Sequence, residues 1–185
     1  MEWVVIGAIV LIVLYVIFIY NRLVSLRQTV SQSWSDISVQ LKQRHDLIPN
    51  LVETVKGYAA HERGTLDAVV KARNAAVAAS DPAAAAQAEN MLTGALRQLF
   101  ALSEAYPDLK ANQNFLALQS ELSDIENKIA AARRFFNNAV SEYNAAIQQF
   151  PAVLLAGTLG FAERTFFELD ESERKSVEST PQVKF

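Results

Sequence analysis

Two histidines, His45 and His61, are the side chains in this sequence best suited to acid–base or metal chemistry. A carboxylate-bridged metal centre in a helical protein uses Glu-x-x-His pairs, because residues three apart share one helical face. Lys42 stands three positions before His45, and Tyr58 three before His61, so the sequence lacks these pairs. There is also no cysteine, which excludes thiolate catalysis and iron–sulfur ligation. We therefore expect no metal or other cofactor, and packing or surface roles for both histidines.

Nucleophilic and phosphate-binding motifs are equally scarce. Serines are numerous, but none stands in the Gly-x-Ser-x-Gly turn that exposes a catalytic hydroxyl. The closely spaced Gly157 and Gly160 form too short a pattern for a phosphate-binding loop and favour a turn. With no catalytic residue to name, we predict a non-enzymatic protein without a small-molecule substrate.

Composition indicates one small domain and an apolar segment. The 185 residues are 51% hydrophobic and 20% charged, enough to form a buried core. The net charge is -3 and no long basic block occurs, which argues against nucleic acid as a partner.

Residues 3–20 read WVVIGAIVLIVLYVIFIY and carry no charge. This run approaches the ~20 residues with which a helix crosses the hydrocarbon core of a bilayer. Trp3 at one end, with Tyr15 and Tyr20 toward the other, suits the aromatic belts at membrane interfaces. We predict a transmembrane anchor over residues 1–21, with membrane lipid as one partner and Arg22 at its boundary.

Charges beside the span predict its orientation. Arg22 and Arg27 follow the span, whereas Glu2 precedes it, so the positive-inside rule favours an external N-terminus and a cytoplasmic body. A cleaved signal peptide is the competing interpretation. It is disfavoured because no basic side chain precedes the apolar run and no small-x-small cleavage site follows it.

The rest of the chain shows helical periodicity. Apolar residues recur every three or four positions, which is typical of one buried helical stripe; the first stripe consists of Leu23, Leu26, Val30, Trp34, Ile37 and Leu41. Prolines at 82, 107 and 151 punctuate the later stripes. We predict an all-α fold, in which the transmembrane helix continues into a long antiparallel bundle of three or four helices. The expected divisions are the bundle at 22–150, a short helix or turn at 151–168, and a flexible acidic tail with an apolar end at 169–185.

Asp46, Pro49 and Asn50 interrupt the long first pattern. Proline removes a helical hydrogen bond, so either the helix kinks here or Asp46 caps a new helix. The apolar stripe then resumes through about Ala79. Arg44 in this polar cluster either pairs with a neighbouring carboxylate, which we favour, or belongs to a binding site.

Two regions are candidates for binding partners. Arg133 and Arg134 either clamp an acidic partner or cover the core with their stems and leave their charges in water. Pro181, Val183 and Phe185 form an apolar terminus that either adds as a strand to a sheet edge or frays.

Several stretches together resemble the LemA family of bacterial membrane proteins. The strongest match is VQLKQRHDLIPNLV at 39–52, followed by EAYPDLKAN at 104–112, ARRFFN at 132–137 and the terminal Pro181-x-Val183-x-Phe185. The resemblance covers essentially the whole chain in the right order. His45 and Phe136 stand where the family more usually has tyrosine, which puts in doubt any role for a hydroxyl there.

The resemblance implies a single-pass protein of the bacterial inner membrane, with its N-terminus outside and a helical cytoplasmic body. The family has no settled activity, but some members are encoded beside a membrane-embedded zinc protease. We therefore expect a scaffold or adaptor that binds other membrane proteins, or that self-associates into a homo-oligomer through a coiled coil along Leu23–Leu41. The alternatives are a membrane-remodelling protein with an interfacial element at 152–167, and an accessory enzyme subunit with acids converging between helices.

Overall fold

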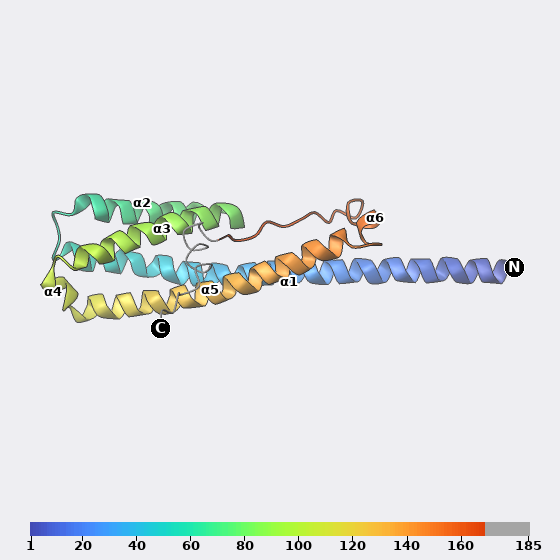
Figure 1. Cartoon of the computed structure of the whole chain (residues 1–185), viewed down its shortest axis with the longest axis horizontal. Coiled ribbons are helices and arrows are strands. Elements are labelled where there is room, and N and C mark those ends of the chain that lie inside the picture. The colour runs from blue at the N-terminus through green and yellow to red at the C-terminus, as the bar shows by residue number, and fades with distance from the viewer. Residues whose placement is uncertain (169–185) are drawn as a thin grey trace, which may run out of the picture. The chain divides into compact units, whose positions relative to one another are not determined.

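The computed structural model describes residues 1–168, and over these it contains helices and no strand (Figure 1). The predicted all-α class is confirmed. In chain order the helices are α1 (Glu2–Lys56), α2 (Arg63–Ala78), α3 (Pro82–Ser103), α4 (Pro107–Lys110), α5 (Gln113–Gln148) and α6 (Val153–Ala156). The acidic tail predicted at 169–185 lies outside the described residues.

The chain divides into two compact units, whose boundaries cut through the two longest helices. The first unit comprises Met1–Ile37 and Ala132–Thr165, and the second comprises Ser38–Ala131 with the described residues from Phe166 on. These units are defined by internal contacts, so they do not test the predicted divisions of anchor, bundle and connecting segment.

The second unit holds the larger apolar core. It contains the end of α1, the helices α2, α3 and α4, and the beginning of α5. In Figure 1, α2 and α3 lie side by side and run in opposite directions, as a short connection requires. Apolar side chains from these helices meet in one cluster, whose most buried members are Ile48, Leu51, Val55, Ala59, Val69, Leu92, Leu99, Leu109 and Phe115.

Two helix starts follow the local chemistry that the sequence indicates. The Asp81 carboxylate accepts hydrogen bonds from the backbone N–H groups of Ala83 (3.0 Å) and Ala84 (2.9 Å), with Pro82 in the first turn of α3. The Asn112 side chain accepts from Phe115 N–H at 2.9 Å and begins α5. Both side chains therefore cap the first turn of their helices.

The first helix differs from expectation at its end. It continues through Pro49, and Asp46 contacts Lys42 rather than capping a new helix. Ile48 and Leu51 are fully buried beside the proline, and their packing outweighs its cost in a helix, about 3 kcal/mol. The kink itself stays a prediction.

The apolar stripe that was expected to resume through about Ala79 is not carried by one continuous helix. The helix ends at Lys56, and the chain turns before Arg63. Gly57 directly follows the last helical residue, and the low helix propensity of glycine favours a helix end there. Ala59 is nevertheless buried in this turn, so the apolar pattern persists across a helix end.

In the first unit, the stripe after the span is covered by the chain itself. Leu23, Val30 and Ile37 are buried, and the Trp34 ring packs against Phe136 of α5 with centroids 5.6 Å apart. Part of this stripe therefore packs within the chain, and a coiled coil between copies along it stays a prediction.

The beginning of α1 is the one helix among the described residues that is long and apolar enough to cross a membrane. Only 6% of its most apolar window is buried in the protein. Trp3, Tyr15, Tyr20 and Arg22 are all exposed, as expected for side chains that face lipid or its boundary. These features fit a membrane protein.

Candidate functional site

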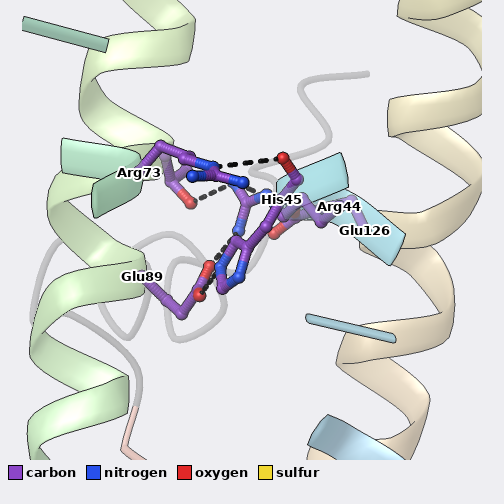
Figure 2. A network of polar contacts seen from close by, with 6 residues as sticks. Arg44, His45, Arg73, Glu89 and Glu126 are labelled. Carbon is purple, nitrogen blue, oxygen red and sulfur yellow. Dashed lines mark hydrogen bonds and ion pairs between the residues drawn. The ribbon is translucent and has the colours of Figure 1, made fainter. Parts of the chain in front are cut away.

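A buried polar network lies in the apolar core of the second unit. Arg44 and His45 on α1 are only 3% and 7% exposed, and Glu89 on α3 is 5% exposed. Figure 2 shows the carboxylate of Glu89 facing both side chains. Its Oε2 lies 3.0 Å from Arg44 Nη1, and its Oε1 contacts His45 Nε2. Both oxygens of one carboxylate therefore bind adjacent residues of α1.

Three further contacts extend the network to other helices. Arg44 Nη2 donates to Thr93 Oγ1 at 2.7 Å and lies 3.3 Å from Glu126 Oε2 on α5. Arg73 of α2 donates from Nε to the backbone oxygen of His45 at 3.3 Å (Figure 2). Within this unit the network thus joins α1, α2, α3 and α5.

The arrangement links helices through buried charged side chains. Arg44 and His45 engage one oxygen each of the Glu89 carboxylate. No group of three or more metal-binding side chains occurs in the described part of the chain. The accessory-enzyme alternative required several inward acids, and Glu89 is the only buried one described.

Sequence reasoning located part of this network. It paired Arg44 with a carboxylate, but that carboxylate comes from α3 instead of a neighbouring position. Glu89 was missed, although a signal existed. It lies on the apolar face of α3, three residues before Leu92 and four after Ala85, both of which are buried. A charged residue on a buried stripe indicates a partner from another helix.

An open groove adjoins the network in the same unit, between α3 and α5. Its volume is about 420 Å³, and it shares Arg44 and Glu126 with the network. Leu96, Phe100 and Leu122 provide apolar lining. The remaining lining side chains are polar or charged: Thr93, Arg97, Gln119, Ser123 and Asn127. The groove thus offers a ligand both apolar contacts and hydrogen-bonding groups, as binding sites do.

The other predicted positions lie apart from this groove. Pro49 and Asn50 are exposed on α1, and the Lys42 ammonium holds the pKa of Asp46 below its ordinary value near 3.8. Arg133 is half-buried and Arg134 is exposed, both on the part of α5 in the first unit. Pro181, Val183 and Phe185 lie outside the described residues, so their suggested role in partner binding stays a prediction.

Comparison with known proteins identifies the family. The sequence profile of the LemA family matches residues 33–185, which is most of the chain. The chain belongs to the LemA family. The resemblance inferred from its motifs is thereby confirmed.

Curated relatives have similar sequences at modest identity. Protein LemA of Metamycoplasma hominis is 27% identical over 164 residues, covering 86% of this chain and 74% of that protein. Magnetosome protein MamQ of Magnetospirillum gryphiswaldense is 26% identical, and MamQ 1 of Paramagnetospirillum magneticum is 25% identical. Each of these two matches covers 80% of this chain and 64% of the relative, so the chain spans less than two thirds of the MamQ proteins. None of these names is that of an enzyme.

Proposed function

We propose that this LemA-family protein is a non-enzymatic membrane adaptor, which binds a segment of another membrane protein in the groove between α3 and α5. The observation that carries the proposal is the groove itself, open to solvent, with the buried Leu96 and Leu122 and the half-buried Phe100 as its apolar lining. A concave site that combines apolar lining with polar groups is the usual form of a binding site.

The chemistry of the groove favours a polypeptide. Apolar lining suits side chains projecting from a helix or extended segment, while Gln119, Ser123 and Asn127 offer hydrogen bonds at intervals along one face of α5. Arg97 at the rim is exposed and favours a partner that carries a carboxylate. The buried network beneath keeps α1, α3 and α5 in register, so the groove is preformed.

The membrane anchor determines where the groove meets its partner. The apolar start of α1 anchors the body to the bacterial inner membrane, with the N-terminus outside and the body in the cytoplasm. A partner anchored in the same membrane gains effective concentration from sharing that surface. Some members of the LemA family are encoded beside a membrane-embedded protease, so such a protease is the first partner to test.

Site-specific photo-crosslinking in living cells tests the adaptor function. A photoreactive amino acid in place of Gln119 reports on the groove, and the same residue in place of Met91 is the control. Met91 is exposed on α3 but does not line the groove. We expect a discrete crosslink to a membrane protein from position 119 and none from position 91.

A blocked groove provides the second arm. Ser123→Trp fills the groove, whereas Ala117→Trp adds the same bulk at an exposed position of α5 outside it. Ser123→Trp should abolish the crosslink from position 119, and Ala117→Trp should leave it. Equal crosslinks from positions 91 and 119, or a crosslink insensitive to Ser123→Trp, would contradict binding in the groove.

A further inference from the structure

Around α6, the first unit exposes a group of large apolar side chains. Phe150 is 80% exposed and Leu154 is 66% exposed, and Val153 and Leu159 are also exposed. Ala152 and Ala156, between them, are buried against the unit. The segment 150–160 thus packs through small residues and presents its large ones outward, the reverse of the usual arrangement in water.

Ring contacts place this segment beside the end of the apolar span. The Phe161 ring, which directly follows the segment, packs edge-on against Tyr20 with centroids 5.8 Å apart. The guanidinium of Arg27 lies 5.2 Å from the same ring centroid. Ile19 is buried, unlike the other large apolar side chains of the span.

The length of the span gives the depth of Tyr20. Residues 3–20 form roughly 27 Å of helix at about 1.5 Å per residue. The hydrocarbon core is ~30 Å thick, so the apolar run is just long enough and its last residue stands at the boundary. Tyr20 is followed by Asn21 and Arg22, whose polarity fixes that boundary. A segment that packs against Tyr20 therefore lies at the level of the lipid headgroups.

Side-chain bonds hold the segment in this place. The Asn144 amide donates to Arg164 O and accepts from Arg164 N, each at 2.9 Å. Tyr143 donates from its hydroxyl to Ala162 O at 3.0 Å, and Gln148 donates to Glu163 Oε1 at 2.7 Å. The chain returning from α6 is thus fastened to α5 at three consecutive residues.

We propose that the segment 150–160 is a second membrane contact, which inserts Phe150 and Leu154 into the boundary between headgroups and acyl chains of the same bilayer. Continuity with the apolar span identifies lipid as the occupant, because the exposed side chains begin where the lipid-facing surface of α1 ends. Arg22 and Arg27 at this level suit phosphate groups. Two contacts instead of one fix how the first unit stands on the membrane surface.

Environment-sensitive fluorescence of the full chain tests this insertion. Because there is no cysteine, a single thiol at Leu154→Cys carries the probe, with Leu11→Cys in the span as the lipid reference. Val77→Cys on α2 is the matched control, since Val77 is also an exposed apolar residue on a helix. In phosphatidylcholine vesicles, we expect blue-shifted emission from position 154 and quenching by lipids spin-labelled near the headgroup. Position 77 should show neither.

Two results would overturn the proposal. An emission at position 154 equal to that at position 77 means that the segment stays in water. A blue shift without quenching by spin-labelled lipid means that protein, a second copy or another chain, covers the segment. For the probe at position 11, quenching by lipids that carry the spin label deeper in the bilayer confirms in the same experiment that the span is inserted.

Discussion

The two carboxylate oxygens of Glu89 bind Arg44 and His45, and all three side chains are buried. Removing one partner of a buried ion pair leaves the other charge unpaired, which costs about 3–5 kcal/mol. We expect Glu89→Ala to lower the free energy of unfolding by about that amount. Denaturant unfolding of the full chain in detergent, followed by circular dichroism, measures it.

Asp46→Ala is the matched control for Glu89→Ala. Asp46 pairs with Lys42 at 2.6 Å, but both side chains are exposed and screened by water. Its lowered pKa means that the pair stabilises the fold above the ordinary pKa near 3.8, and that this effect is lost as pH falls through the lower folded value. Asp46→Ala should therefore have a much smaller effect at neutral pH and none in stronger acid. Equal losses for the two variants would show that Glu89 is not a buried clamp.

At the scale of elements, Asn144 is one of three α5 side chains that hold the chain returning from α6. Its side-chain amide binds both backbone groups of Arg164, so Asn144→Ala removes these two hydrogen bonds. We expect faster hydrogen exchange of the 161–165 amides in the variant, with α2 and α3 unchanged. Asn138→Ala, an exposed asparagine on the same helix, is the control and should leave exchange at 161–165 as it is. Unchanged exchange in Asn144→Ala would contradict the fastening role.

Elements whose signals are local were predictable. Asp81 and Asn112 start α3 and α5 as their residue types indicate, because a cap needs only its own first turn. The end of α1 was missed because Gly57 competes with an apolar pattern that Ala59 continues through the turn. The pairing of Arg44 with Glu89 was missed because its distance along the chain depends on how α1 and α3 pack. Likewise, periodicity alone does not say whether α5 or another copy covers a stripe.

At the scale of the whole molecule, function depends on which side of the membrane the body occupies. Arg22 and Arg27 follow the apolar span, which ends at Tyr20. Moving such charges through the bilayer is costly, so they favour retention in the cytoplasm. The adaptor role needs this orientation, because the groove must face partners on the cytoplasmic side.

Single thiols and a membrane-impermeant maleimide measure the orientation. We expect Glu2→Cys to react in intact spheroplasts, and Val77→Cys to react only after the membrane is broken. Replacing both arginines, Arg22→Glu with Arg27→Glu, removes the bias and should produce a population labelled at position 77 from outside. Ser31→Glu with Ser35→Glu adds two acids further along α1 and leaves both arginines, so it controls for added negative charge. Labelling of Val77→Cys in intact spheroplasts of the otherwise unchanged protein would place the body outside and rule out a cytoplasmic partner for the groove.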